Sequence, residues 1–357
     1  MPSKRLRELG ITIGHFPTGP LNAITDVNGV AVGHATLIHD QPRVARTGIT
    51  MILPRGQQTW TDYAFAGFYA QNGNGEMTGT HWIAETGLLC SPIGITNTFQ
   101  VGMVRDALIE YAVERGYPQT ESSDLPVVAE TYDGWLNDIA AFHLTKEHVF
   151  AALRDAKSGP VAEGNVGGGT GMTCHEFKGG IGSASRIVDS PSGTFTLGAL
   201  VQANYGDRLL LRVDGIPVGR LIGSQEPPIP WPEPPVMNSI IVVIATDAPL
   251  LPVQCTRLAR RASVGLARVG GISSNADGDI FLAFATGNTM PYESDDLIPL
   301  RMVPHEHLSL FFEAAAEAVQ EAILNALTMA ETMTGFEDRI AYALPLKRLV
   351  EIVHQYR

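Results

Sequence analysis

Long apolar runs are the clearest pattern along the chain. Four of them predict strands, at 196–203 (TLGALVQA), 208–213 (RLLLRV), 239–246 (SIIVVIAT) and 279–286 (DIFLAFAT). Apolar residues in these runs are nearly continuous instead of alternating with polar ones, which predicts sheets covered on both faces. Helices must supply part of that cover.

Two segments with helical periodicity are candidates for this cover. The first begins near Pro252, a favoured first-turn residue, runs to Arg268 and stops at Gly270-Gly271. The second runs from about Glu306 to Met329. The apolar stripes of the two helices are Cys255, Leu258, Ala259, Ala262 and Leu266, and Leu308, Phe312, Ala315, Val319, Ala322 and Ala326.

Three acids on the second helix follow a spacing of four residues. They are Glu313, Glu317 and Glu321. Such a row is typical of a solvated outer face, and we favour that interpretation over a metal site.

A proline-rich stretch divides the chain between Gln225 and Asn238. Six prolines fall between positions 227 and 235, and proline has no N–H to donate, so this stretch predicts an extended surface connector. Because strongly apolar segments lie on both sides of it, we expect one domain over residues 1–357.

Composition and charge narrow the classes of partner. The chain has 357 residues, is 45% hydrophobic and carries a formal charge of -12, which argues against nucleic acid or an anionic membrane as a partner. No apolar run approaches 18 residues, and the first ten residues lack an apolar segment behind their charges. We expect a cytoplasmic protein, or a periplasmic one if a signal has been removed, with small molecules or peptides as its ligands.

The cysteines and histidines give no metal or disulfide pattern. Cys90, Cys174 and Cys255 are far apart without CxxC spacing, which predicts reduced thiols. The histidines show no H-E-x-x-H spacing, and the glycine-rich GNVGGGTG at 164–171 fits no phosphate-binding motif. We therefore expect no metal and no cofactor, and we expect these glycines to let backbone pass close to backbone or to point amides into a cavity.

The junction Asn238-Ser239 is the strongest candidate for chemistry. If the bond before Ser239 breaks, one residue supplies a hydroxyl nucleophile and an α-amine, whose ordinary pKa of about 7.7 to 8.0 suits a base near neutral pH. The alternative is an ordinary strand that begins with serine after a linker.

Two further segments place polar groups at the ends of apolar runs. VVAETYDGWLNDI (127–139) carries Glu130, Tyr132 and Asp133, either as a site-forming loop or as a turn with capping acids. If its strand continues through Tyr132, the side chains of Glu130 and Tyr132 lie on the same side. Asn204 follows TLGALVQA and could donate to an oxyanion or satisfy turn amides.

Together these segments resemble the family of self-processing L-aminopeptidase/D-amidase-esterases and β-peptidyl aminopeptidases. The matching pieces follow the family's order from about residue 10 to 335. They are GPLNAITDVNGVAVGHATLI, RTGITMILPR, NGNGEMTGTHWIAETG, PIGITNT, VVAETYDGWLND, GNVGGGTGM, FKGGIGSASR, ALVQANYG, NSIIVVIATDAPL, RLARRASVGLAR and DIFLAFATGN.

The resemblance implies an α+β fold, a four-layer αββα sandwich layered like N-terminal-nucleophile hydrolases. It also implies self-cleavage before Ser239 into an α chain (1–238) and a β chain (239–357), and assembly as a tetramer of cleaved pairs. The activity implied is aminopeptidase or amidase action on α-, β- or D-amino acid peptides, amides or esters, through an acyl-enzyme.

Site residues carry over one by one. By resemblance, Ser239 is the nucleophile, Asn204 donates to the oxyanion, Tyr132 lines the nucleophile's pocket, and Glu130 receives the substrate's free amino group. A buried ammonium needs a counter-charge, which explains the choice of a carboxylate.

One stretch departs from the family pattern. Where relatives have SNGSGD this chain has SNADGD, with Asp277 at the serine's position and Asp279 at the acid's. A further carboxylate near the α-ammonium would raise the pKa of the amine, so we expect a more alkaline activity optimum if Asp277 points inward. If Asp277 faces solvent instead, Ser274 could take over the polarising role.

Two other functions stay open at this point. One is an acyltransferase similar to ornithine acetyltransferase, whose nucleophile is a threonine. The other is a small-molecule binding protein that kept the fold and lost activity, which the change at Asp277 makes conceivable.

Overall fold

The computed structural model describes residues 2–117, 125–230 and 238–356. The strands are β1 (Ala31–His39), β2 (Ala45–Leu53), β3 (Asp62–Ala70), β4 (Leu88–Leu89), β5 (Ile93–Asn97), β6 (Val127–Thr131), β7 (Thr173–Cys174), β8 (Phe177–Lys178), β9 (Gly180–Ser190), β10 (Gly193–Asn204), β11 (Ser239–Thr246), β12 (Ile280–Pro291), β13 (Met333–Thr334) and β14 (Ile340–Ala341). The helices are α1 (Thr80–Thr86), α2 (Val101–Arg115), α3 (Lys146–Asp155), α4 (Val218–Ile222), α5 (Pro252–Ala259), α6 (Ala262–Val269), α7 (Leu308–Thr328) and α8 (Leu346–Tyr356).

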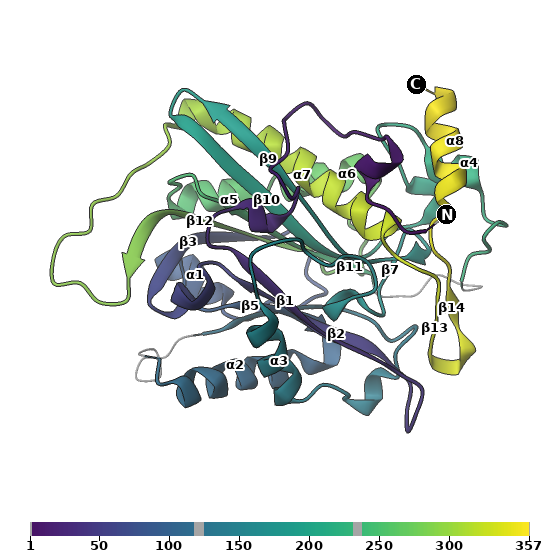
Figure 1. The fold of residues 1–357 in the computed structure, drawn as a ribbon, viewed down its shortest axis with the longest axis horizontal. Helices are drawn as coiled ribbons and strands as arrows, with labels where there is room; N and C mark the ends of the chain where they lie inside the picture. The colour runs from purple at the N-terminus through teal and green to yellow at the C-terminus, as the bar shows by residue number, and fades with distance from the viewer. Residues whose placement is uncertain (1, 118–124, 231–237, 357) are drawn as a thin grey trace.

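Two stacked sheets form the centre of the molecule (Figure 1). The first has the strand order β1-β2-β5-β6, and the second has the order β4-β3-β12-β11-β10-β9. Helices α2 and α3 pack on the outer face of the first sheet, and α5, α6 and α7 pack on the outer face of the second. The predicted four-layer αββα sandwich is therefore confirmed.

Strand β11 shows why its sequence is apolar at nearly every position. Ile240, Val242 and Ile244 belong to the core between the six-stranded sheet and the helices. Ile241 and Val243 belong to the core between the two sheets. Side chains alternate between two buried faces, so neither face of the strand needs polar residues.

Strands β10 and β11 are neighbours in the six-stranded sheet, although a segment that includes α4 lies between them in the sequence. These strands pair antiparallel, with Leu197 opposite Thr246 and Asn204 opposite Ser239. Segments on both sides of the proline-rich stretch thus build one sheet. The predicted connector itself lies partly outside the described residues, at 231–237.

The predicted strand at 208–213 is wrong. Residues Arg208–Leu210 form a 3₁₀ turn instead. The Arg208 side chain is fully buried and donates to the carbonyl oxygens of Glu176 at 2.7 Å and Gly223 at 3.3 Å, while Leu209 is exposed. The arginine turns inward because unpaired backbone carbonyls need its donors, which reverses the burial that hydropathy predicts.

The predicted helices are confirmed with one change. The segment beginning at Pro252 is broken at Arg260-Arg261 into α5 and α6, although its predicted apolar stripe is buried. Helix α6 ends at Gly270, whose φ of 108° favours glycine. Helix α7 matches the longer prediction to within two residues at its N-terminal end.

The interpretation of the acidic row on α7 as a solvated face is wrong for two of its three members. Glu317 and Glu321 are 2% and 0% exposed, because the N-terminal segment around Leu6–Ile13 packs over the helix. The buried Arg186 guanidinium donates to Glu317 at 2.9 Å and to Glu321 at 2.8 Å. Burial pushes the pKa of Glu321 upward, but its arginine partners outweigh burial and hold that pKa below its ordinary value.

The cysteine thiols match the expectation from the sequence. All three cysteines are buried and free, as predicted.

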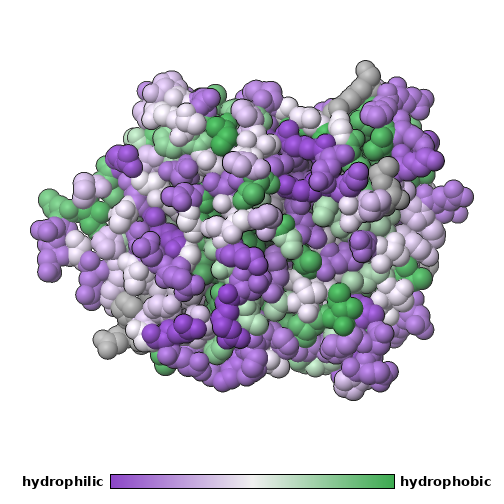
Figure 2. All heavy atoms as spheres, viewed as in Figure 1, coloured by the Kyte–Doolittle hydropathy of each residue, from purple (hydrophilic) through white to green (hydrophobic). Residues whose placement is uncertain are grey.

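Within the described ranges, no helix is long and apolar enough to cross a membrane. On the face drawn in Figure 2, hydrophilic side chains predominate and hydrophobic ones lie in several separate areas.

Removing the buried arginine should destabilise the fold strongly. We expect Arg186→Leu to lower the free energy of unfolding by about 3–5 kcal/mol, because the buried Glu317 loses its arginine partner and the buried Glu321 keeps only Arg7. Arg348→Leu is the control, since Arg348 and Glu351 form a half-exposed pair at 3.5 Å worth roughly 0–1 kcal/mol. Urea unfolding measures both variants, and equal stability of the two would contradict the assignment.

Candidate active site

Ser239 is the first residue of β11 and is 5% exposed. Its Oγ donates to the carbonyl oxygen of Asn238 at 2.6 Å. The backbone N–H of Gly278 faces both groups, at 3.0 Å from Ser239 Oγ and 3.2 Å from the Asn238 oxygen. The hydroxyl therefore lies beside the carbonyl of the bond that precedes it, with an N–H donor at the oxygen.

Asn204 ends β10 and lies opposite Ser239 in the ladder. Its Oδ1 accepts from the N–H of Thr173 at 2.9 Å, and its Nδ2 donates to the carbonyl oxygen of Tyr132 at 3.0 Å. Thr173 thus fixes which end of the carboxamide carries the donors. One Nδ2 hydrogen is used by Tyr132, and an amide nitrogen has a second.

Tyr132 follows β6, which ends at Thr131. The strand does not continue through Tyr132, so the expectation that Glu130 and Tyr132 lie on the same side of one strand does not apply. The half-buried Tyr132 phenol packs over Gly134, where a Cβ would lie 2.3 Å from the phenol oxygen. Tyr132 still reaches the nucleophile's neighbourhood through its backbone bond to Asn204.

Glu130 is buried at the end of β6, with 3% of its surface exposed. Its Oε1 accepts from the N–H of Glu76 at 3.0 Å, and its Oε2 accepts from the Thr98 hydroxyl. Burial raises the pKa of this carboxyl, although both hydrogen bonds oppose the change. Val127 and Ala129 of the same strand pack in the core between the two sheets, whereas Val128, which shares a strand face with Glu130, packs in the core under α2 and α3.

Asp277 and Asp279 flank Gly278 in the loop that enters β12. They are 5% and 1% exposed, so Asp277 does not face solvent. Asp277 Oδ2 accepts from the N–H of Ser274 at 2.6 Å, and Asp279 Oδ1 accepts from the N–H of Ile240 at 3.1 Å. The second Asp279 oxygen is buried and has no hydrogen-bond partner of normal length, although the nearby Ser273 side chain opposes the rise in the pKa of this carboxyl.

Both aspartates are harder to ionise than usual. Burial raises the pKa of Asp277 to about 6, and Asp207 adds to the effect. Burial likewise raises the pKa of Asp279 to about 6, with the charge of Asp277 as a further cause. Both carboxyls are therefore mainly charged at pH 7 and above, and become neutral as the pH falls below about 6.

Sequence reasoning missed the residues that hold this loop. Asn72 accepts from the N–H of Asp279 at 2.7 Å, and Asn74 donates to the carbonyl oxygen of Ala276 at 2.7 Å. Gly278, the donor to Ser239, was also missed. The turn-forming run QNGNG after a strand was the available signal, but it does not say which loop the turn contacts.

The glycine-rich segment packs backbone on backbone, as predicted. A Cβ on Gly168 would lie 2.6 Å from the carbonyl oxygen of Ile95, and one on Gly169 would lie 2.4 Å from the amide of Ile181. The nearby Asp133 is fully buried and accepts from Asn137. Burial raises its pKa to about 7. These contacts support the loop that carries Tyr132.

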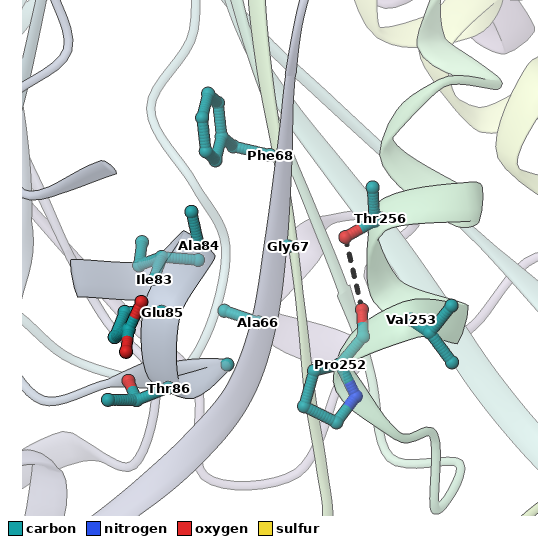
Figure 3. Close-up of a pocket in the computed structure, with 11 residues that line it drawn as sticks. Ala66, Gly67, Phe68, Ile83, Ala84, Glu85, Thr86, Pro252, Val253 and Thr256 are labelled. Carbon is teal, nitrogen blue, oxygen red and sulfur yellow. Dashed lines mark hydrogen bonds between the residues drawn. The ribbon is translucent and has the colours of Figure 1, made fainter. Parts of the chain in front are cut away.

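A cavity and a cluster of possible metal ligands are weaker candidates for a functional site than the region around Ser239. A cavity of about 450 Å³ lies between β3, α1 and α5 (Figure 3), but its lining is largely apolar and its Thr256 hydroxyl already donates to Pro252 at 3.2 Å. Elsewhere, His15, Glu313 and Glu317 lie close enough to hold an ion. Glu317, however, already accepts from Arg186 and from the N–H of His15.

The comparisons with known proteins agree with one another. A family model described as peptidase family S58 matches residues 22–341. The chain is 45% identical to the beta-peptidyl aminopeptidase BapA of Sphingosinicella microcystinivorans, over 99% of this chain and 92% of that protein. A solved beta-aminopeptidase of Burkholderia sp. superposes with a TM-score of 0.90 at 50% identity, covering 99% of each chain.

A second solved structure carries the fold assignment. The L-aminopeptidase D-Ala-esterase/amidase of Ochrobactrum anthropi superposes with a TM-score of 0.91 at 45% identity, covering 99% of this chain and 98% of that one. That protein is described as a prototype for the serine aminopeptidases and as a variant of the Ntn hydrolase fold. The chain therefore belongs to peptidase family S58, and it is a hydrolase of the aminopeptidase class with an Ntn-hydrolase-like αββα fold.

Proposed function

We propose that this aminopeptidase cleaves its own chain before Ser239 and then uses Ser239 as the nucleophile. The contact between Ser239 Oγ and the Asn238 carbonyl, with the Gly278 N–H at 3.0 and 3.2 Å from the two oxygens, carries the proposal. An N–H aimed at a carbonyl oxygen stabilises the negative charge that develops there during attack.

Self-cleavage follows from this geometry. The Ser239 oxygen attacks the Asn238 carbonyl carbon, the C–N bond breaks, and the hydroxyl proton passes to the departing nitrogen. Water then hydrolyses the resulting ester, which leaves a carboxylate on Asn238 and a free amine on Ser239. The buried Asp279 oxygen without a hydrogen-bond partner of normal length is a suitable acceptor for that new ammonium group.

Catalysis would reuse the same atoms. The free α-amine of Ser239 takes the hydroxyl proton, the oxygen attacks the substrate carbonyl, and an acyl-enzyme forms with release of the amine or alcohol. Asn204 donates its second amide hydrogen to the oxyanion, since Thr173 holds the carboxamide with nitrogen facing Tyr132. Water completes the cycle.

Glu130 would receive the substrate's free amino group. Its carboxyl is buried, accepts only from the Glu76 N–H and the Thr98 hydroxyl among the described residues, and has no cationic partner there. Substrates would be short peptides, amides or esters of α-, β- or D-amino acids. An ammonium group would offset the burial that raises the pKa of Glu130.

Assembly and location are proposed on resemblance. We propose a tetramer of cleaved αβ pairs acting in the cytoplasm on small peptides or amides, without nucleic acid or membrane partners. The formal charge of -12 supports the absence of a nucleic-acid partner.

Replacing the nucleophile should abolish both reactions. We expect wild-type protein to run as fragments of 238 and 119 residues on denaturing electrophoresis, and Ser239→Ala to stay intact with activity lower by roughly 10⁴- to 10⁶-fold. Ser192→Ala, at an exposed serine, serves as the control. Mass spectrometry that shows active wild-type protein as one unbroken chain would reject self-processing, and an unbroken chain without activity would favour the binding-protein alternative.

The extra carboxylate should shift the pH dependence of the cleaved enzyme. The amine must be neutral to act as a base, so activity rises as the pH passes the amine's pKa. Asp277 is charged above about pH 6, raises that pKa, and moves the acidic limb of the profile to higher pH. We expect Asp277→Ser to move this limb to lower pH in kcat measurements, and a flat profile from about pH 7 to 9 that the variant leaves unchanged would refute the idea.

Glu130 should distinguish free from blocked amino groups. We expect the wild-type enzyme to hydrolyse an amide with a free amine at least about 10²-fold faster than its acetylated form, because only the ammonium pairs with the carboxylate. Glu130→Gln should reduce that preference. Equal turnover of both substrates by the wild-type enzyme would remove Glu130 from this role.

A further inference from the structure

The loop between β3 and α1 contacts both halves of the candidate site. We call residues 71–76 (QNGNGE) the asparagine loop. On one side it is bonded to the loop that enters β12, which supplies the Gly278 donor to Ser239. On the other side it is bonded to Glu130.

Asn72 makes the first connection with both ends of its carboxamide. Its Oδ1 accepts from the N–H of Asp279 at 2.7 Å, and its Nδ2 donates to the carbonyl oxygen of Ser274 at 2.9 Å. The half-buried Asn72 side chain therefore spans the turn that holds Asp277 and Gly278. The N–H of Gln71 adds a bond to the carbonyl oxygen of Asp279 at 2.9 Å.

Asn74 makes the second connection. Its backbone N–H donates to the Asp277 carbonyl oxygen at 3.1 Å, and its side chain donates to the Ala276 carbonyl oxygen at 2.7 Å. The two loops touch backbone to backbone here, because a Cβ on Gly75 would lie 2.9 Å from the Cα of Gly278. There is little room for one loop to move without the other.

Glu76 makes the third connection through its backbone. Its N–H donates to Glu130 Oε1 at 3.0 Å, only two residues after Asn74. The Thr98 hydroxyl holds the other carboxylate oxygen. The position of Glu130 is thus tied through the asparagine loop to the position of the Gly278 N–H at Ser239.

We propose that the asparagine loop is a spacer that sets the separation between Glu130 and Ser239. This separation selects between two kinds of substrate, those with the amine on the carbon next to the scissile carbonyl and those with the amine one carbon further away. The inference rests on the proposed function, since it assigns Glu130 to the amino group and Ser239 to the carbonyl. One added methylene moves the amine by roughly 1.5 Å, the length of a C–C bond. Positioning errors of that size change rates strongly.

Asn72 and Asn74 are positioning residues in this proposal. Their hydrogen bonds go to loop backbone and not to the groups assigned to substrate, so their loss should loosen the spacing without removing a reacting group. The signature is a loss of discrimination between substrates of different length. A residue that only stabilised the fold would lower activity toward both substrates equally.

The test compares the p-nitroanilides of α-alanine and β-alanine. For wild-type enzyme, Asn72→Ala and Asn74→Ala, kcat/KM is measured on both compounds, and the ratio of the two values is the readout. One methylene in a site is typically worth about 10- to 200-fold, so we expect the wild-type ratio to differ from one by at least about tenfold and the variants to move it toward one by about fivefold or more. Asn28→Ala, at an exposed asparagine outside the asparagine loop, should leave the ratio unchanged.

Folding is checked by the extent of self-cleavage and by thermal unfolding of each variant. If Asn72→Ala fails to fold, the exposed Asn74 remains a separate test of the same connection. Equal losses on both substrates, or a wild-type ratio close to one, would overturn the spacer.

Failure of the spacer and failure of the proposed function give different results. An unchanged ratio in enzyme that depends on Ser239 rejects only the spacer. Full activity of Ser239→Ala, or equal turnover of free and acetylated substrates by wild-type enzyme, rejects the function on which the spacer rests.

Discussion

The pairing of β11 with both of its neighbours is the constraint on which the site depends. Because β10 runs antiparallel to β11, the end of β10 meets the start of β11, and Asn204 lies opposite Ser239. Because β12 runs parallel to β11, the loop that enters β12 also meets that start, and it brings Gly278 to the Ser239 hydroxyl. Three segments far apart in sequence thus converge where three interior strands of the sheet begin or end.

Burial restricts movement where these segments meet, and it also makes the charged form of the acids there costly in free energy. Glu130, Asp277 and Asp279 are nearly inaccessible, and burial raises the pKa of each. Among the ion pairs of the described residues, none involves these three carboxyls. Glu321 shows the contrast, because Arg7 and Arg186 hold its pKa below the ordinary value despite burial. Buried acids without a basic partner are typical of a site that receives cations. Under the proposed function, these cations would be the ammonium groups of the substrate and of the new chain end.

Much of the molecule could be predicted from local pattern. Strand β11 and helix α7 were identified because long apolar runs and a 3.6-residue stripe report directly on burial. The resemblance assigned site roles to Glu130, Asn204, Ser239 and Asp279, and these roles stay predictions. The structure places Asn204 opposite Ser239 and Asp279 at the N–H of Ile240. Two other interpretations failed for a common reason. The Arg208 side chain and the acids Glu317 and Glu321 are buried with polar partners from distant segments, and hydropathy counts only the residue itself.

The sequence by itself determined the layered fold, the candidate nucleophile and the unusual acid at Asp277, because each depends on residue type and order. Only the tertiary structure decided that Asp277 points inward, that Gly278 supplies an N–H to Ser239, and that Asn72 and Asn74 join this loop to the one beside Glu130. Hydrogen bonds between loops depend on the separation and angle of backbones about 200 residues apart in the chain, and no local pattern of residues encodes those distances.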